Sequence, residues 1–381
     1  MDACSTGRRR TMKKPPAILR SAADLVAAGL LPDAERDAIE RLAATYAIGI
    51  TSTVAALIDR ADPHDPIARQ FVPDLAERAE QPDEMADPTG DLLFSPVDGI
   101  VHRYPDRVLL KLLHICPVYC RFCFRRTVVG PNSPTHLSSD SLAVAIGYIA
   151  DHPAIWEVIL TGGDPLTLSV RRLAEIMARL KAIDHVKILR LHTRVPIADP
   201  AKITAKLAAA LLASGKTVYV ALHANHPREM SEAARAACAK FIDAGIPMLS
   251  QSVLLAGVND DIETLTALMR AFVEARIKPY YLHQLDPAPG TGHFRVPLAK
   301  GRDLMRQLRG RVSGLCQPHF MLDIPGGHGK SPIGPNYVTE SSPREAYWVI
   351  DYKGQPHRYP LETRETGEIR GSDATRLKST S

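Results

Sequence analysis

This sequence has no long apolar run, few aromatic residues and no strong charge imbalance. No stretch of its 381 residues approaches the roughly eighteen consecutive apolar residues of a transmembrane helix, so no membrane span is expected. The basic N-terminal tail is not followed by an apolar signal-peptide core, which argues against secretion. Aromatic residues make up only 6% of the chain and the net charge is only +5. A nucleic-acid-binding protein is therefore disfavoured, because it would need stacking platforms and a basic face.

Cysteine is also scarce, with six residues in the chain. So few thiols in so long a sequence do not make a disulfide scaffold. Cys4, Cys238 and Cys316 are scattered, whereas the other three lie close together, as metal ligands do. This usage favours a protein of the reducing cytoplasm.

What remains is the composition of an ordinary globular protein, with 45% hydrophobic and 23% charged residues and room for a sizeable core. Residues 1–20 are expected to be disordered. Helices are expected between Ser21 and Ala56, with Ser21 as the first N-cap and Pro32 opening the second helix. A connection rich in Pro, Asp and Gly then runs from Ala61 to Gly99.

From Val108 onward, strand and helix patterns alternate. Such βα repeats predict a parallel sheet with right-handed crossovers, although periodicity alone does not separate a doubly wound sheet from a barrel. Two N-caps are predicted, Ser169 and Asp199, the second followed by Pro200. The expected strands are 108–113, 155–160, 186–191, 217–222, 247–254 and 279–283, with another at 319–324. The expected helices are 139–150, 169–181, 200–213, 229–244, 260–274 and 298–311.

Three cysteines follow the first of these strands at a C-x3-C-x2-C spacing: Cys116, Cys120 and Cys123. Thiolates this close can converge on zinc or on an iron–sulfur cluster, both of which usually take four ligands. With zinc, His114 or His136 would be the fourth ligand. With a [4Fe–4S] cluster, the fourth iron keeps an open position, which a small molecule with an amine and a carboxylate could chelate.

Four motifs stand out in the sequence: Cys120-Arg121-Phe122-Cys123-Phe124-Arg125-Arg126, Thr161-Gly162-Gly163-Asp164, His223-Ala224-Asn225-His226-Pro227 and Pro325-Gly326-Gly327-His328-Gly329-Lys330. Together with the cysteine spacing they resemble the lysine 2,3-aminomutase family of radical S-adenosylmethionine (SAM) enzymes, over roughly Asp87 to Pro335. The resemblance implies an α/β fold, the partial TIM barrel (βα)6, preceded by an N-terminal helical extension. Residues 1–90 would be the basic tail and helical region, 91–335 the catalytic domain and 336–381 a C-terminal extension.

The resemblance also implies three cofactors. A [4Fe–4S] cluster would bind the three loop cysteines, and SAM would bind the cluster. Pyridoxal 5′-phosphate (PLP) would form a Schiff base with Lys330, although a lysine in a glycine-rich stretch could equally face solvent. Arg103 and Arg107 are candidates for the PLP phosphate, which suits guanidinium geometry. The remaining cofactor-binding candidates are Gly162, Gly163, Asp164, His223 and Gln251.

Charge complementarity and the family motif together predict the substrate. Arg125 matches the position that pairs with the substrate α-carboxylate, and Asp286 and Asp323 match the two acids that hold a distal ammonium. Two acids opposite one arginine suit a diamino acid and would repel the side chain of glutamate. The implied reaction interconverts L-lysine and β-lysine, with an electron donor such as flavodoxin or ferredoxin. Each acid alone could also be a helix cap or a surface charge.

Several features depart from the family pattern. No cysteine follows Cys316, so the structural zinc of some members is not expected and their tetrameric assembly cannot be carried over, which leaves a homo-oligomer open. Phe124 is similar to the branch that supplies β-lysine to translation elongation factor P. Three alternatives stay open: a radical SAM enzyme acting on another amino acid, a radical SAM enzyme of different chemistry, and a PLP enzyme with structural zinc.

Overall fold

The computed structural model describes residues 18–130, 135–340 and 346–360. The chain divides into two compact units, Met1–Gly334 and Pro335–Ser381. Of the tail expected to be disordered, residues 1–17 lie outside the described part. Ile18–Leu19 is not disordered but forms strand β1, because it pairs antiparallel with β2 (Ile50–Thr51).

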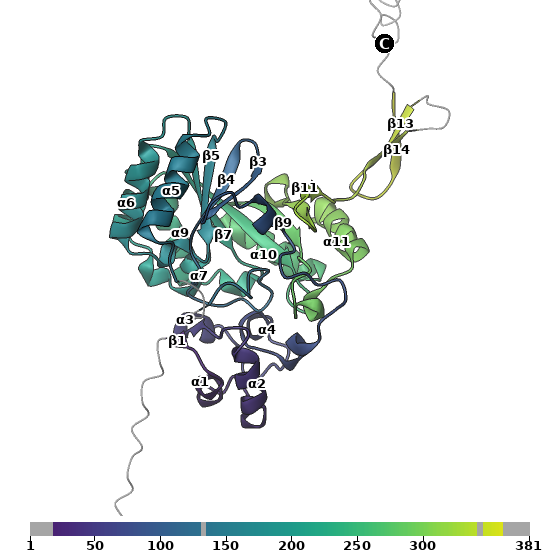
Figure 1. Cartoon of the computed structure of the whole chain (residues 1–381). Coiled ribbons are helices and arrows are strands. Elements are labelled where there is room, and N and C mark those ends of the chain that lie inside the picture. The colour runs from purple at the N-terminus through teal and green to yellow at the C-terminus, as the bar shows by residue number, and fades with distance from the viewer. Residues whose placement is uncertain (1–17, 131–134, 341–345, 361–381) are drawn as a thin grey trace, which may run out of the picture. The chain divides into compact units, whose positions relative to one another are not determined.

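A curved sheet of nine strands forms the centre of the first unit, in the order β11-β10-β9-β8-β7-β6-β5-β4-β3 (Figure 1). Strands β4 to β10 run parallel, while β3 and β11 pair antiparallel at the two edges. This sheet confirms the predicted partial barrel. The strands are β3 (Ile100–Tyr104), β4 (Arg107–Leu113), β5 (Glu157–Gly162), β6 (Ile188–Thr193), β7 (Thr217–His223), β8 (Met248–Leu254), β9 (Ile277–Gln284), β10 (His319–Ile324) and β11 (Gly329–Pro332).

Six longer helices connect the strands and cover the outer face of the sheet. Ser169 caps its helix as predicted, because its side chain accepts the Arg172 amide at 3.2 Å. The helix predicted at 200–213 is wrong at its start: Asp199 makes no side-chain cap bond, and Thr204 caps the helix instead. The helices are α5 (Ser139–Ala150), α6 (Val170–Lys181), α8 (Ala205–Leu212), α9 (Glu232–Asp243), α10 (Ile262–Glu274) and α11 (Leu298–Arg311).

Alternation along the strands separates an apolar outer layer from a polar interior. In β6, Leu189 and Leu191 are fully buried in the large core under the helices. Arg190 and His192 alternate with these leucines and therefore point to the opposite face, into the barrel. In β4, Lys111 likewise interrupts the apolar run. The barrel thus buries charged and polar side chains that must find partners or a ligand.

The N-terminal helices pack against loops at the carboxyl ends of the parallel strands. Thr51 donates a hydrogen bond to the Ala198 carbonyl, after β6, at 2.6 Å. Tyr119 and Arg121, after β4, donate their amides to Gly49 and to another N-terminal carbonyl at 3.0 and 2.8 Å. Ser21 forms the predicted capping box. The N-terminal helices are α1 (Ala22–Ala27), α2 (Arg36–Ala43), α3 (Ser52–Ala55) and α4 (Pro66–Phe71). Ala198 ends the short helix α7 (Val195–Ala198), which follows β6.

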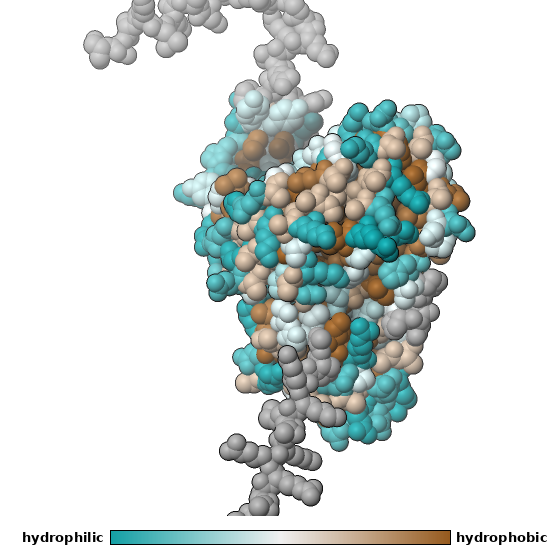
Figure 2. Space-filling model, turned by 90° about the vertical axis from the view of Figure 1, so that its left-hand side faces the viewer, coloured by the Kyte–Doolittle hydropathy of each residue, from teal (hydrophilic) through white to brown (hydrophobic). Residues whose placement is uncertain are grey.

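The second unit contains a three-stranded antiparallel sheet of β12 (Val338–Glu340), β13 (Ala346–Ile350) and β14 (Pro356–Pro360). Among the described residues, no helix is long and apolar enough to cross a membrane. The face in Figure 2 shows hydrophobic residues scattered among hydrophilic ones.

Candidate active site

The three clustered cysteines lie in the loop that leaves β4, and all are free thiols. Burial raises the pKa of each, that of Cys120 to about 11. The negative charges of the neighbouring thiols and of Asp164 raise the pKa of Cys116 further. The thiols therefore share one environment in which a bound cation would favour their thiolate forms.

A buried carboxylate from the N-terminal region fastens this loop. Glu77, in the short 3-10 helix Leu75–Arg78, is fully buried and pairs with Arg121 through two hydrogen bonds of 2.9 and 2.6 Å. It also pairs with Arg126. The two arginines flank Cys123, so one acid holds both sides of the loop. Burial lowers the pKa of Arg126, while Glu77 opposes that shift.

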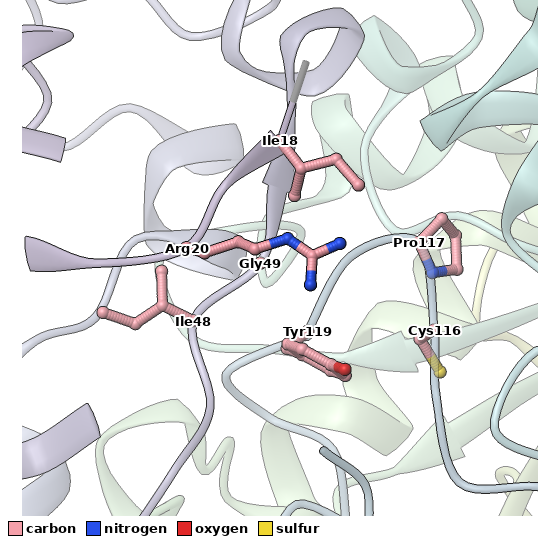
Figure 3. Close-up of a pocket in the computed structure, with 7 residues that line it drawn as sticks. All are labelled: Ile18, Arg20, Ile48, Gly49, Cys116, Pro117 and Tyr119. Atoms are coloured by element: carbon pink, nitrogen blue, oxygen red, sulfur yellow. The ribbon is translucent and has the colours of Figure 1, made fainter. Parts of the chain in front are cut away.

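A small recess opens on the side of the loop that faces the N-terminal segment (Figure 3). Gly49 permits it, since a Cβ atom there would meet the Tyr119 ring at 2.8 Å. In Figure 3 the Arg20 guanidinium extends across the recess toward the loop. The lining residues are Ile18, Arg20, Ile48, Gly49, Cys116, Pro117 and Tyr119.

The glycines of the second motif bring β5 against the cysteine loop. A Cβ on Gly163 would lie 2.1 Å from the Ile115 carbonyl, so any other residue would push the chains apart. Asp164 is buried and accepts hydrogen bonds from Thr193 at 2.8 Å and the Arg194 amide at 2.7 Å. Burial raises its pKa. The structure thus places this predicted SAM contact beside the cysteines, with protein donors on both of its oxygens.

Histidines and amides line the barrel interior near the same end. His223 and Gln251 are neighbours on β7 and β8, and burial lowers the pKa of His223 to about 3. Burial, together with Lys330, lowers the pKa of His283 on β9 to about 3 as well. Both rings are therefore neutral at pH 7, with one donor and one acceptor nitrogen each. Several buried polar atoms in the described part of the barrel have no hydrogen-bond partner: His192 Nε2, Gln251 Oε1, Gln284 Oε1 and Asp323 Oδ1.

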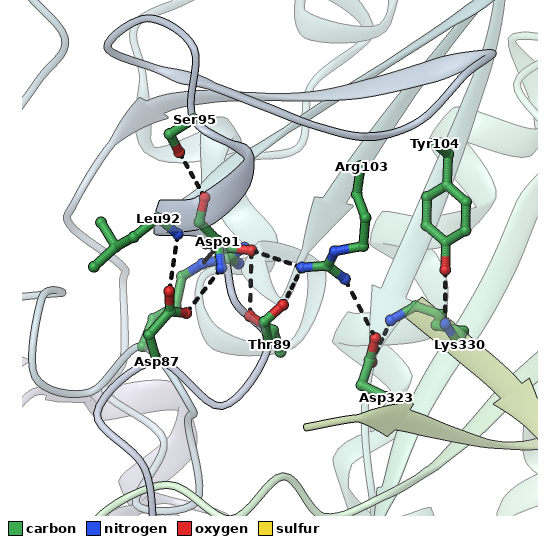
Figure 4. Close-up of polar contacts among 10 residues, drawn as sticks. Asp87, Thr89, Asp91, Leu92, Ser95, Arg103, Tyr104, Asp323 and Lys330 are labelled. Carbon is green, nitrogen blue, oxygen red and sulfur yellow. Dashed lines mark hydrogen bonds and ion pairs between the residues drawn. The ribbon is translucent and has the colours of Figure 1, made fainter. Parts of the chain in front are cut away.

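Lys330 lies on the edge strand β11, opposite Asp323 on β10. Its ammonium pairs with Asp323, which also faces the Arg103 guanidinium at 3.8 Å (Figure 4). Its amide donates to the Tyr104 hydroxyl at 2.7 Å, which joins the two edges of the open sheet. Arg107 lies over the Tyr104 ring at 3.8 Å, at the turn between β3 and β4. Of the two predicted phosphate-binding arginines, Arg103 therefore shares Asp323 with Lys330, whereas Arg107 pairs with Asp106 at 2.7 Å and is more exposed.

Arg125 meets an acid that the sequence reasoning missed. Its Nε and Nη2 atoms donate to Asp91 Oδ2 at 3.2 and 2.8 Å. Asp91 also faces Arg103 Nη2 at 3.4 Å, so it bridges two of the predicted ligand-binding arginines. A lone acid in a loop rich in Asp, Pro and Gly carries no sequence signal of its own. The arginines, which need counter-charges when buried, were the only hint.

Asp286 follows β9 and is the second predicted ammonium ligand. Burial and the negative charge of Asp323 raise its pKa to about 7, while Lys330 and Arg125 oppose the rise. Asp323 has cations directly beside it, whereas Asp286 has no ion-pair partner within the described part of the chain. The two acids thus compete for one set of positive charges, and the pKa of Asp286, which has no cation directly beside it, is raised.

Comparison with known proteins decides the family. The radical SAM superfamily model matches residues 110–269, and the lysine-2,3-aminomutase model matches residues 305–364. The chain is 41% identical to the L-lysine 2,3-aminomutase of Acetoanaerobium sticklandii, over 81% of this chain and 74% of that protein. It is 38% identical to the L-lysine 2,3-aminomutase of Fusobacterium nucleatum, over 90% and 82%. The chain belongs to the lysine 2,3-aminomutase family.

This lysine 2,3-aminomutase family member is therefore a radical SAM isomerase. It is also 34% identical to the glutamate 2,3-aminomutase of Clostridioides difficile, over 80% of this chain and 72% of that protein. Sequence similarity alone thus does not decide between lysine and glutamate as the substrate. The side chains that line the site must decide it.

The superfamily implies a [4Fe–4S] cluster and SAM, and the donor set of the loop fits a cluster. Three thiols in one short loop are soft ligands that leave one iron without a protein ligand. Among the described residues, no group of three or more His, Cys, Asp or Glu already surrounds a metal position. Of the two alternative zinc ligands, His136 is exposed and contacts Thr135 at 3.0 Å, which disfavours it. His114 is partly buried, and its Nδ1 atom has no hydrogen-bond partner among the described residues.

We predict that Glu77→Gln lowers the free energy of unfolding by about 3–5 kcal/mol, because it leaves two buried arginines without their counter-charge. Urea denaturation followed by circular dichroism measures this. Asp83→Asn is the matched control, since Asp83 pairs with Arg295 at the surface and should change little. Equal effects of the two variants would show that Glu77 does not hold the loop.

The raised pKa of Asp286 predicts a pH dependence of folding. Between its usual value of 3.8 and about 7, the folded chain binds more protons at Asp286 than the unfolded chain. The stability of the ligand-free protein at this site therefore falls as pH rises through that window. Asp286→Asn should remove this loss of stability. The melting temperature of the variant minus that of the wild type should therefore increase from pH 5 to pH 8. A constant difference across that range would contradict the raised pKa.

Proposed function

We propose that this family member is a PLP-dependent L-lysine 2,3-aminomutase that interconverts L-lysine and β-lysine. The observation that carries the proposal is the pair Asp286 and Asp323, which share one barrel interior with Arg125 and Lys330. An arginine facing two acids suits an amino acid with a second ammonium group. Glutamate would place its side-chain carboxylate against the same acids and raise their pKa values at a cost in free energy.

The chain's own residues would divide the work as follows. Cys116, Cys120 and Cys123 would hold the cluster, and the backbone of Gly162 and Gly163, which packs directly against the cysteine loop, would line the SAM site. Lys330 would hold PLP, with Arg103 and Arg107 on its phosphate. When bound, these cofactors supply an adenosyl radical and the conjugated carbonyl chemistry that moves an amino group to the neighbouring carbon.

Asp323 would change partners during binding. In the ligand-free structure it neutralises the Lys330 ammonium. With the Lys330 amine held by the cofactor, a free ammonium would no longer lie beside Asp323, which could then face the distal ammonium of an incoming substrate. The same carboxylate would thus keep a counter-charge in both states, which a buried acid requires.

The histidines of the barrel interior would be neutral when the substrate binds. With pKa values of about 3, His223 and His283 carry no charge that would repel the substrate ammonium at neutral pH. The unpartnered atoms of His192 and Gln251 are available to polar ligand groups. The helices and the N-terminal region would exclude water, which a carbon radical requires.

We predict that Lys330→Ala abolishes both the absorbance of lysine-bound PLP and turnover. The protein would be purified anaerobically, reconstituted with iron and sulfide, and supplied with SAM, PLP, dithionite and L-lysine. Lys181→Ala, at the exposed end of α6, is the control and should keep both signals. Retention of the PLP band in Lys330→Ala would remove the PLP assignment.

The same assay tests the substrate. Derivatised products are separated by chromatography after incubation with L-lysine or L-glutamate. We expect β-lysine and little β-glutamate, and we expect Asp323→Asn to lower kcat/KM for L-lysine about a hundredfold, because one charge-assisted contact is lost. SAM cleavage without any β-lysine would leave the radical SAM assignment intact and refute the role of the two acids. The physiological electron donor would be a small redox protein such as flavodoxin or ferredoxin.

A further inference from the structure

Asp91 occupies a position that the proposed roles do not explain. It is an acid, 8% exposed, placed directly against Arg125, the proposed partner of an anionic substrate group. A carboxylate there either neutralises Arg125 or determines its orientation. The contacts of the guanidinium distinguish these two roles.

Asp91 uses only one edge of Arg125. Both hydrogen bonds, from Nε and Nη2, end on the same oxygen, Asp91 Oδ2. Nη1 has no hydrogen-bond partner among the described residues, and the Phe124 ring lies 4.4 Å from the guanidinium carbon. One edge is therefore fixed by an acid and one face by a ring, while the remaining edge stays available to a planar carboxylate.

Asp91 is itself held by several hydrogen bonds, which Figure 4 shows. Asp87 accepts the amides of Asp91 and Leu92 at 2.9 and 2.8 Å. Ser95 donates to the Asp91 carbonyl at 2.7 Å, and Thr89 donates to Asp91 Oδ1 at 3.2 Å. A side chain used only for neutralisation would not need its loop to be fixed in this way.

The loop is also tied to the turn that precedes Lys330. Gly90 has a φ of +66°, and a Cβ there would lie 2.7 Å from the Gly327 Cα. The Gly326 amide donates to the Pro88 carbonyl at 3.1 Å. The loop that carries Asp91 and the turn that precedes Lys330 are therefore packed against each other.

We infer that Asp91 is a positioning residue, which holds the guanidinium of Arg125 so that its Nη1 edge receives the α-carboxylate of the amino acid substrate. The inference rests on the proposed function, since it assumes an amino acid held between Arg125 and Lys330. It adds to that function a residue that acts on the substrate through Arg125, while its other carboxylate oxygen, Oδ1, faces Arg103 at 3.4 Å.

The inference is tested by whether Asp91→Asn weakens or tightens the binding of L-lysine. Asp91→Asn removes a negative charge, which by electrostatics alone would tighten binding of a carboxylate. If Asp91 positions Arg125, the freed guanidinium regains rotamers and binding weakens, by about tenfold. The readout is the Kd of L-lysine, titrated through the PLP absorbance of the anaerobic holoenzyme without reductant, so that no turnover occurs.

L-Lysine amide is the matched ligand, because it keeps both amines and lacks the carboxylate charge. We expect its Kd to change less than twofold in Asp91→Asn. Asp91→Glu keeps the charge but displaces the guanidinium, so it should also weaken L-lysine selectively, and it is the second variant if Asp91→Asn does not fold. Asp98→Asn, an exposed acid in the same segment, should leave both ligands unaffected.

Each outcome has a separate meaning. A tighter or unchanged Kd for L-lysine in the Asp91 variants overturns the positioning role, as does an equal loss for L-lysine and its amide. A wild-type holoenzyme without a PLP band, or with a band that L-lysine does not alter, refutes the proposed function instead. Selective weakening of L-lysine in the Asp91 variants supports the inference.

Discussion

The structure depends on the pairing of charges that the barrel buries. The outward residues of each strand are apolar and pack under the helices, so the inward residues are left to make the site, and many of these are charged. A buried charge is tolerated only with a counter-charge or a ligand. Arg125 with Asp91 and Lys330 with Asp323 are the resulting pairs, and Asp286 is the acid left over, which explains its raised pKa.

The same constraint organises the cysteine loop. Arg121 and Arg126 are buried on either side of Cys123 and both depend on Glu77, which comes from the region before the barrel. The N-terminal region is therefore part of the site. It covers the carboxyl ends of the strands, supplies the acid that holds the loop, and leads into the segment that carries Asp91. A reading of this region as a mere preface to a catalytic barrel would miss these contributions.

Some of the fold follows directly from local patterns. The strands and most helices were predictable because hydrophobic periodicity is strong in a sheet that is covered by helices, and Ser21 and Ser169 cap as their sequence predicts. The Asp199 cap was wrong, since Pro200 starts only a short 3-10 turn and Thr204 offers the better cap. Edge strand β3 was missed because Ile100–Tyr104 carries no clear alternation.

The sequence by itself determined which residues can do chemistry here. The spacing of the cysteines, the glycine-rich lysine motif and the strand-terminal positions are local properties of the chain, and they pointed to one family and one edge of one sheet. Only the tertiary structure decided which of these groups face each other. Asp91 lies 34 residues from Arg125 and Glu77 lies 44 from Arg121, and no local pattern reports a pairing across such distances. Those pairs arise from burial, because a charge removed from water takes the counter-charge that the fold brings to it.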